Sequence, residues 1–308
     1  MSQGAFLGTS EFAAVVLGYL AASAHRPSLV VTLPDRKRGR GRRLQPSPVA
    51  AAAAELGIEV LKSANVNEEG DRERIIAAGG EWASICAFGQ LIREPLLSDR
   101  PMLNVHPSLL PRWRGAAPIE RAIMAGDQET GVCVMRLEAG LDSGPVALRR
   151  STPIDVEEDF AQLSARLAAI GGELLVEALD LAAAGRIEWT EQGEEGVTYA
   201  EKIEPAERRL DPAMAVCPVN DLIRALTPHV GAFIELGGGE RLAVRSARPA
   251  GEGVMPGLGP GEFAEDEGRL FFGCADGALE LLEVQPAGGK QMDAASYLRG
   301  RGVPTAAA

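Results

Sequence analysis

The sequence predicts an α/β protein: a Rossmann-like domain with a mostly parallel sheet, followed by a small all-β domain of the OB-like barrel type. Two observations predict this fold class. Short apolar runs alternate with helix-period segments through the first half of the chain, a pattern typical of parallel sheets covered by helices. Brief strands separated by glycine fill the second half, as in small antiparallel barrels. The length of 308 residues is enough for one large domain or two ordinary ones.

The first half supplies the elements of a parallel sheet. The apolar and β-branched runs predict strands at 5–7, 29–32, 58–61, 83–87, 102–106 and 130–137. The segments between them predict helices at 11–20, 48–56 and 72–78. Apolar residues then recur at three- and four-residue steps from Phe160 to Leu181, which predicts one long helix that Gly185 ends.

The character of the chain changes after this helix. Residues 188–204 are polar and acidic, and we interpret them as a linker between a domain at 1–187 and a domain at 205–308. In the second domain the pattern predicts a short helix at 217–226 and strands at 232–236, 241–246, 270–273 and 279–284.

Composition and charge narrow the class of protein. The net charge of -12 argues against nonspecific binding to polyanions, so we expect no DNA partner. Four well-separated cysteines without a CxxC spacing predict neither a zinc site nor a disulfide framework, and we expect no bound metal. No apolar run reaches membrane-spanning length, and no basic region precedes an apolar core at the N-terminus, so we expect a cytoplasmic protein without a membrane partner.

One predicted strand ends in two polar side chains. Asn104 and His106 lie two residues apart, so alternation places them on the same side of the strand at 102–106. The carboxyl end of a parallel strand faces the crevice where open α/β sheets bind ligands. There an amide can stabilise an oxyanion and an imidazole can accept a proton. The alternative is a capping asparagine beside a structural histidine.

A carboxylate framed by glycines follows the next strand. Asp142 lies in Gly140-Leu141-Asp142-Ser143-Gly144, where the backbone can approach a ligand closely. This carboxylate is a candidate to orient the imidazole of His106. The alternative is an ordinary turn that favours Asp for local hydrogen bonds.

A basic segment interrupts the acidic chain after the second predicted strand. Its cations are Arg36, Lys37, Arg38, Arg40, Arg42 and Arg43, with Gly39 and Gly41 among them. Arginine binds phosphate in a bidentate manner and glycine keeps a loop pliable, so we expect a loop that engages RNA. The alternative is a solvated basic loop. The turn after the first strand, Gly8-Thr9-Ser10-Glu11-Phe12, lacks the GxGxxG pattern, so a dinucleotide site is poorly supported.

Taken together, these motifs resemble those of the methionyl-tRNA formyltransferase family along nearly the whole chain. The run from Asn104 to Ile119, which includes Asn104-Val105-His106-Pro107-Ser108-Leu109-Leu110-Pro111, is the most specific of them. The Gly8 turn, the Gly39-Arg40-Gly41 loop, the Asp142 motif and Tyr199-Ala200-Glu201-Lys202 accompany it in the same order. The Asn–His–Asp set alone is less specific, because folate-dependent formyltransferases that act on other amines share it.

The resemblance implies transfer of a formyl group from 10-formyltetrahydrofolate to the α-amino group of initiator methionyl-tRNA. It implies that Asn104, His106 and Asp142 are catalytic. It implies a folate site formed by Ser108, Leu109, Leu110 and Pro111 together with Phe88, Gly89, Leu91 and Ile92. It also implies that Arg36, Lys37, Arg38, Arg40, Arg42 and Arg43 contact the tRNA, with Arg40 at the acceptor stem. We expect a monomer.

Three alternatives remain open at this point. A formyltransferase for a small amine, such as a nucleotide sugar or glycinamide ribotide, would share the first domain; the Gly-Arg-Gly loop and the barrel-like second domain argue against it. A noncatalytic RNA-binding module is disfavoured by the intact Asn104, His106 and Asp142. A dehydrogenase is disfavoured by the missing glycine fingerprint.

Overall fold

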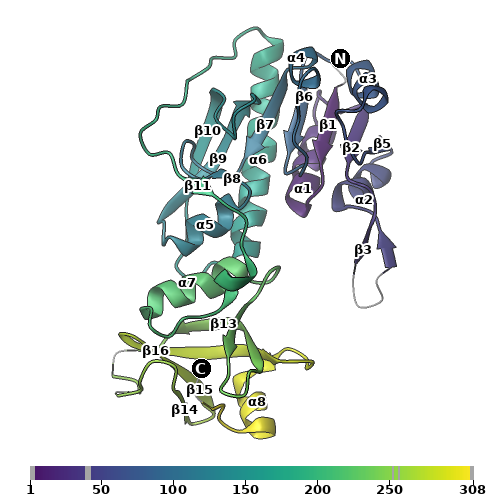
Figure 1. Cartoon of the computed structure of the whole chain (residues 1–308). Coiled ribbons are helices and arrows are strands. Elements are labelled where there is room, and N and C mark those ends of the chain that lie inside the picture. The colour runs from purple at the N-terminus through teal and green to yellow at the C-terminus, as the bar shows by residue number, and fades with distance from the viewer. Residues whose placement is uncertain (1–3, 39–42, 252, 256, 306–308) are drawn as a thin grey trace. The chain divides into compact units, whose positions relative to one another are not determined.

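The computed structural model of the chain describes residues 4–38, 43–251, 253–255 and 257–305 (Figure 1). The chain divides into two compact units. The first consists of Met1–Pro118, Glu129–Pro153 and Ser164–Ala200, and the second of Ile119–Gln128, Ile154–Leu163 and Glu201–Ala308. The predicted fold class is confirmed, since a mostly parallel α/β unit is followed by an antiparallel one.

The first unit is built on a seven-stranded sheet in the order β10-β9-β7-β6-β1-β2-β5. Its strands are β1 (Ala5–Gly8), β2 (Leu29–Thr32), β5 (Glu59–Lys62), β6 (Ala83–Cys86), β7 (Met102–His106), β9 (Glu129–Arg136) and β10 (Val146–Pro153). The five strands from β7 to β5 are parallel, whereas β9 and β10 run antiparallel at one edge. The sequence predicted every strand of this sheet except β10, in which charged and hydroxyl residues interrupt the apolar pattern.

Two helices of the first unit begin directly after a capping serine. The helices of this unit are α1 (Glu11–Ala22), α2 (Pro48–Glu55), α3 (Glu69–Ala77), α4 (Leu96–Asp99) and α6 (Phe160–Ala183), the last of which begins in the second unit. The Ser10 and Ser47 hydroxyls accept hydrogen bonds from the third following backbone N–H, which caps α1 and α2. Gly185 lies just beyond α6 at φ 65°, as the prediction of its end required.

Helices cover both faces of this sheet (Figure 1). On one face Ile75 of α3 and Leu96 of α4 pack with the side chains of Leu7, Val31 and Met102. On the other face α1 packs against α2, and Gly171 of α6 lies so close to Val105 of β7 that an added Cβ would come within 2.8 Å of it. The central strands β1, β2, β6 and β7 are therefore buried on both sides, as their apolar sequences indicate.

The strand order reverses between β1 and β6. From β1 the chain proceeds to β2 and β5 on one side, and then returns to β6, β7 and β9 on the other. The Thr9 hydroxyl, just after β1, donates a hydrogen bond of 2.7 Å to the carbonyl of Phe88, just after β6. In doubly wound sheets ligands bind outside the carboxyl ends of the strands at such a reversal.

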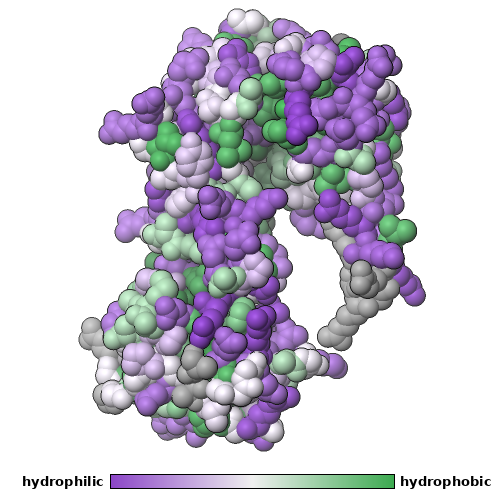
Figure 2. All heavy atoms as spheres, in the orientation of Figure 1, coloured by the Kyte–Doolittle hydropathy of each residue, from purple (hydrophilic) through white to green (hydrophobic). Residues whose placement is uncertain are grey.

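The two ends of the basic segment form short paired strands, which we call the basic hairpin. Strands β3 (Arg36–Arg38) and β4 (Arg43–Gln45) pair antiparallel, with Arg36 opposite Gln45. The sequence predicted only a loop here, because runs of charged residues carry no apolar alternation. Figure 2 shows the described part of this hairpin as largely hydrophilic.

The second unit is an antiparallel sheet with helices against it. Its strands are β12 (Ala232–Glu235), β13 (Arg241–Pro249), β14 (Phe263–Asp266), β15 (Arg269–Cys274), β16 (Gly277–Pro286) and β17 (Met292–Asp293). Register shifts between Val244 and Ala247 mark bulges in β13, which increase the local twist of a sheet. Helices α5 (Pro118–Met124), α7 (Val216–Leu226) and α8 (Ala294–Arg301) complete the unit, with a 3-10 turn at Pro205–Arg208. Helices α4, α5 and α8 and strands β14 and β17 were not predicted.

Its core is apolar and continuous. Val219 and Ile223 of α7 pack with Val244, Phe272 and Val284 of the sheet. Helix α7 presents one strongly apolar face. Within the described residues, no helix combines the length and apolar character needed to cross a membrane.

Candidate active site

Strand β7 carries two polar side chains into the carboxyl edge of the first sheet. Asn104 pairs in register with Ile85 of β6 and with Met135 of β9, and His106 pairs with Cys133 of β9. Both polar residues are buried, with 9% of Asn104 and 4% of His106 exposed. Burying a polar side chain costs free energy unless it makes hydrogen bonds. The partners of Asn104 and His106 therefore indicate why these residues are kept in the sheet.

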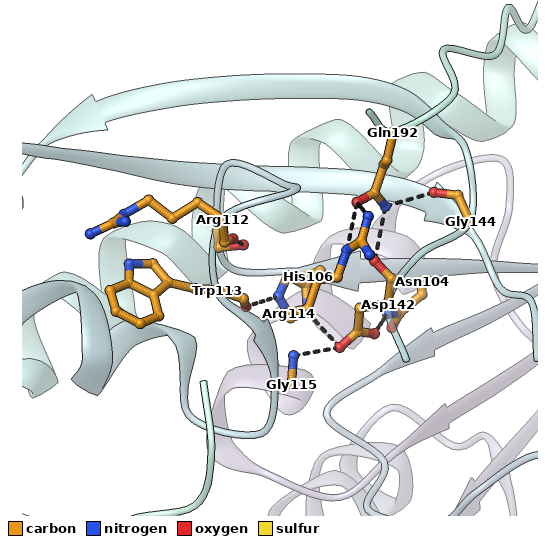
Figure 3. A network of polar contacts seen from close by, with 10 residues as sticks. Asn104, His106, Arg112, Trp113, Arg114, Gly115, Asp142, Gly144 and Gln192 are labelled. Atoms are coloured by element: carbon orange, nitrogen blue, oxygen red, sulfur yellow. Dashed lines mark hydrogen bonds and ion pairs between the residues drawn. The ribbon is translucent and has the colours of Figure 1, made fainter. Parts of the chain in front are cut away.

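The structure brings Asp142 to both of them (Figure 3). The Asn104 Nδ2 atom donates to Asp142 Oδ1 at 3.4 Å, and His106 Nδ1 lies 3.6 Å from Asp142 Oδ2. The Asp142 side chain is 14% exposed. These contacts are long for hydrogen bonds, as catalytic contacts often are before a substrate binds. The three side chains that the sequence singled out therefore meet at one place.

The second imidazole nitrogen of His106 is already bonded. Its Nε2 atom lies 2.8 Å from the carbonyl oxygen of Trp113. Because a carbonyl can only accept, Nε2 carries the proton and the lone pair of the neutral ring lies on Nδ1. Trp113 adopts φ 62°, in the left-handed region that bulky residues avoid. A strained residue thus fixes which nitrogen of His106 is basic.

Gly115 supplies a backbone donor to Asp142. Its N–H bonds Asp142 Oδ2 at 2.9 Å. Gly115 has φ 119°, and a Cβ there would lie 2.8 Å from the carbonyl oxygen of Ala200. Glycine is needed at this position because strand β8 (Arg114–Gly115) pairs directly with β11 (Tyr199–Ala200).

Two site residues escaped the prediction. Gln192 donates from Nε2 to the carbonyls of Asp142 and Gly144, at 2.9 and 2.7 Å, and accepts from Arg114 at 3.0 and 2.8 Å. Gln192 lies in the segment predicted as a linker, and no local pattern marks a side chain whose partners are 48 to 78 residues away. The contact of Trp113 with His106 uses a backbone atom, which residue type does not reveal.

The first predicted folate segment follows His106 directly. Ser108 is fully buried and its hydroxyl donates to the Arg112 carbonyl at 2.6 Å, so the hydroxyl is used inside the protein. Leu110 is also buried, and packs with β9 and β10. Leu109 and Pro111 are half-buried. They are the members of this segment whose side chains retain access to a ligand.

The second predicted folate segment follows β6 at the reversal of strand order. Phe88 and Ile92 are buried in the core beneath the sheet. Leu91 is 64% exposed, and Gly89 is exposed with φ 86°. The Leu91 side chain and the backbone at Gly89 therefore face outward, whereas Phe88 and Ile92 hold the segment in place.

Of the basic residues, Arg36, Lys37 and Arg43 are exposed on the β3–β4 hairpin. Arg40, Arg42 and the side chain of Arg38 lie outside the described residues.

The neighbouring thiols are unsuited to nucleophilic catalysis. Burial raises the pKa of Cys133, which pairs with His106, to about 11. Burial also raises the pKa of Cys86 at the end of β6. Because the thiolate is the reactive form, both side chains are inert near neutral pH. The amide of Asn104, the imidazole of His106 and the carboxylate of Asp142 are therefore the candidate catalytic groups at this edge.

Comparison with known proteins matches both units. A family model described as "Formyl transferase" matches residues 4–179, and "Formyl transferase, C-terminal domain" matches residues 202–302. The methionyl-tRNA formyltransferase of Ruegeria pomeroyi is 43% identical over 303 residues, covering 97% of both chains. That of Phenylobacterium zucineum is 45% identical over 307 residues, again covering 97% of both.

Solved structures share the fold at low sequence identity. A variant of HypX from Aquifex aeolicus superposes with a TM-score of 0.69 at 19% identity, covering 99% of this chain and 48% of HypX. This chain thus spans about half the length of HypX. An N-formyltransferase from Helicobacter canadensis, in complex with folinic acid and dTDP-3-aminofucose, has a TM-score of 0.68 at 16% identity, covering 95% and 100% of the two chains. From the family models and the full-length relatives together, the chain belongs to the methionyl-tRNA formyltransferase family.

Proposed function

We propose that this chain transfers the formyl group of 10-formyltetrahydrofolate to the α-amino group of initiator methionyl-tRNA. The observation that carries the proposal is the meeting of Asn104, His106 and Asp142 at the carboxyl edge of the sheet. The full-length relatives, which are named methionyl-tRNA formyltransferases, support the choice of substrates.

The reaction needs an oxyanion stabiliser. The amine nitrogen attacks the formyl carbon, a C–N bond forms, and the carbonyl oxygen becomes negatively charged. The Asn104 Nδ2 atom has two hydrogens, one of which is directed to Asp142. The second donates to the oxyanion, and a preorganised donor of this kind typically contributes 10²–10³-fold in rate.

One proton must move from the attacking amine to the departing folate nitrogen. His106 accepts it at Nδ1, because the Trp113 carbonyl holds the other proton at Nε2. The imidazolium that forms is stabilised by the Asp142 carboxylate beside Nδ1. The bond from the formyl carbon to the folate nitrogen then breaks, and that nitrogen receives the proton from His106. These steps need no metal ion.

The folate lies between the two loops that follow β6 and β7. Ser108, Leu109, Leu110 and Pro111 form one side of its site, and Phe88, Gly89, Leu91 and Ile92 form the other. Within these sets Leu91, Leu109 and Pro111 make side-chain contact, since they are exposed or half-buried. The buried members fix the loops.

The tRNA is bound by the basic hairpin and by the second domain. Arg36, Lys37, Arg38, Arg40, Arg42 and Arg43 contact the phosphate backbone and the acceptor end. Residues 1–187 form the catalytic domain, 188–204 connect the domains, and 205–308 contact the body of the tRNA. The protein acts as a monomer in the cytoplasm.

The direct test is a formylation assay. The purified protein is incubated with charged initiator methionyl-tRNA and 10-formyltetrahydrofolate, and the blocked amino group is measured after hydrolysis of the ester. Parallel reactions contain a nucleotide-linked amino sugar or glycinamide ribotide in place of the tRNA. We expect formylmethionine only in the tRNA reaction. Formylation of a small amine without formylation of the tRNA would reject the proposed substrate.

A further inference from the structure

The side chain of Gln192 touches the Asp142 loop without touching the catalytic groups themselves. We infer that Gln192 is a positioning residue that holds the Asp142 carboxylate in place, and that Arg114 orients the Gln192 amide (Figure 3). The inference rests on the proposed function, in which Asp142 is catalytic. It assigns a role in the reaction to a segment whose sequence indicated only a linker.

Every hydrogen-bonding position of the Gln192 amide is used. The Nε2 atom has two hydrogens and donates to Asp142 O at 2.9 Å and to Gly144 O at 2.7 Å. The Oε1 atom accepts from Nε and Nη2 of Arg114, at 3.0 and 2.8 Å. An amide has two donors and two acceptor lone pairs, so all four are satisfied. Side-chain networks of this completeness are specific in geometry.

Arg114 determines which way the amide faces. A guanidinium only donates hydrogen bonds, so Arg114 pairs with the amide oxygen Oε1 and cannot pair with the amide nitrogen. The Nε2 atom must then face the two carbonyls of the Asp142 loop. A glutamate at position 192 would still pair with Arg114, but it has no hydrogen to donate to those carbonyls. A side chain at position 192 that only pairs with Arg114 is therefore not sufficient to hold the Asp142 loop.

The Asp142 loop needs this support because its backbone is strained. Asp142 has φ 44°, a strained conformation that a non-glycine residue keeps only where its surroundings impose it. Its carbonyl is bonded by Gln192, while its carboxylate is bonded by the Gly115 N–H. Two bonds at opposite ends of one residue fix the Cα atom and the direction of the carboxylate toward His106.

The same segment also supports His106. Thr190 exchanges two backbone hydrogen bonds with Val146 at the start of β10, of 2.8 and 2.9 Å, which anchors the segment two residues before Gln192. Six residues after Gln192, the Thr198 hydroxyl accepts from the Trp113 N–H at 2.9 Å. Trp113 in turn accepts from His106. Residues 190–200 thus brace Asp142 through Gln192 and His106 through Trp113.

The experiment uses the full-length protein and the formylation assay. The variants are Gln192→Met, Gln192→Glu, Asp142→Ala and the double variants of Asp142→Ala with each Gln192 change. Gln285→Met is the matched control, because Gln285 also accepts from an arginine, Arg245 at 2.7 Å, and donates to a carbonyl, Gly289 at 3.0 Å, but in the second unit. Thermal unfolding measured by circular dichroism separates loss of fold from loss of positioning.

We expect Gln192→Met and Gln192→Glu to lower kcat by roughly 10- to 100-fold, the size of effect that misplacement of a catalytic group produces. The KM values for both substrates should stay within about twofold. In the Asp142→Ala background the same changes should lower kcat no further, since Gln192 acts through Asp142. Gln285→Met should leave kcat at saturating methionyl-tRNA unchanged, because its bonds to Arg245 and Gly289 lie in the second unit.

Three results would overturn the inference. The first is wild-type kcat in both Gln192 variants. The second is restoration of kcat by glutamate, which would mean that pairing with Arg114 is all that matters. The third is a full additive loss in the Asp142→Ala background, which would indicate a general structural role. If Asp142→Ala itself retains wild-type kcat, the catalytic role of Asp142 has failed instead, and the two failures are thereby distinguished.

Discussion

The Nε2 atom of His106 donates a 2.8 Å hydrogen bond to the backbone carbonyl of Trp113. This contact decides which atom of the imidazole is basic, because it leaves the lone pair of the neutral ring on Nδ1. Asp142 lies on the Nδ1 side, with Oδ2 at 3.6 Å. The backbone carbonyl of Trp113, which sequence-based reasoning does not identify, thus sets which nitrogen of His106 carries the proton.

The tautomer of His106 can be measured directly. We expect the neutral ring to carry its proton on Nε2, with Nδ1 showing the ¹⁵N chemical shift of an unprotonated nitrogen. The chain has only three histidines, so a His25→Gln, His229→Gln variant would leave one resonance set to assign. A neutral ring with the proton on Nδ1 would contradict the role of the Trp113 carbonyl.

The basic hairpin is expected to serve tRNA binding and not the chemical step. Arg40→Ala and Lys37→Ala should raise the KM for methionyl-tRNA and leave kcat at saturating tRNA within about twofold. Each should also reduce the slope of log affinity against log salt by about 1, since each removes one phosphate contact. Steady-state kinetics between about 50 and 200 mM salt check this.

Arg186→Ala is the matched control for the hairpin. Arg186 is exposed and follows the carboxyl end of α6, where Leu179 and Ala183 line a cavity with Gly4 and Ser84 at the opposite edge of the sheet. We expect this variant to bind tRNA like the wild type. An equal loss of affinity in Arg186→Ala and Arg40→Ala would show that the hairpin contributes only net charge.

The thiols should differ sharply in reactivity. Burial raises the pKa of Cys133 and of Cys274 to about 11, and it raises the pKa of Cys86 as well, whereas Cys217 is exposed. A raised pKa means less thiolate at a given pH. At pH 8 we expect a disulfide reagent to titrate one thiol in the native protein and all four in denaturant. A second fast-reacting thiol in the native protein would contradict the burial of Cys86, Cys133 or Cys274.

Acid should remove one stabilising contact in the second unit. The hydrogen bond from Arg121 lowers the pKa of Glu207 below its ordinary value of 4.5, with the backbone N–H of Glu204 adding to the effect against a cost of burial. A carboxyl group whose pKa is lower in the folded state stabilises the fold fully at pH values above its unfolded-state pKa. This stabilisation is lost as the pH falls through its folded-state pKa. We expect Glu207→Gln to lower the free energy of unfolding by about 0.5–1 kcal/mol at pH 7.

Urea denaturation as a function of pH checks this, with Glu240→Gln as control because its carboxylate is 4.0 Å from Arg301 at an exposed site. The difference between Glu207→Gln and the wild type should shrink as pH falls below 4.5. A difference that persists unchanged at low pH would show that the charge of Glu207 contributes nothing.

Local periodicity was sufficient to predict strand β7 and most of the sheet. The buried run at 102–106 predicted β7, and alternation placed Asn104 and His106 on one side of it. The glycines around Asp142 marked its carboxylate as a candidate, and in the structure Asp142 itself adopts φ 44°. Strand β7 and the alternation of its side chains are local features, so the local sequence is enough to predict them.

What sequence reasoning missed depends on distant contacts. Gln192 is a site residue because the segment 190–200 returns to β8 and β10, and its own neighbours are polar residues without periodicity. Strand β10 alternates poorly because Arg149 and Arg150 lie at its centre on an edge strand. In each case tertiary contact, and not propensity, determines the outcome.

The central claim is that Asn104, His106 and Asp142 act together on one formyl carbon, and single-turnover kinetics of His106→Ala test it most directly. The account predicts a fall in the rate of formyl transfer of about 10²-fold or more, with the affinity for methionyl-tRNA unchanged in a filter-binding assay. A His106→Ala protein that transfers formyl at the wild-type rate would contradict it.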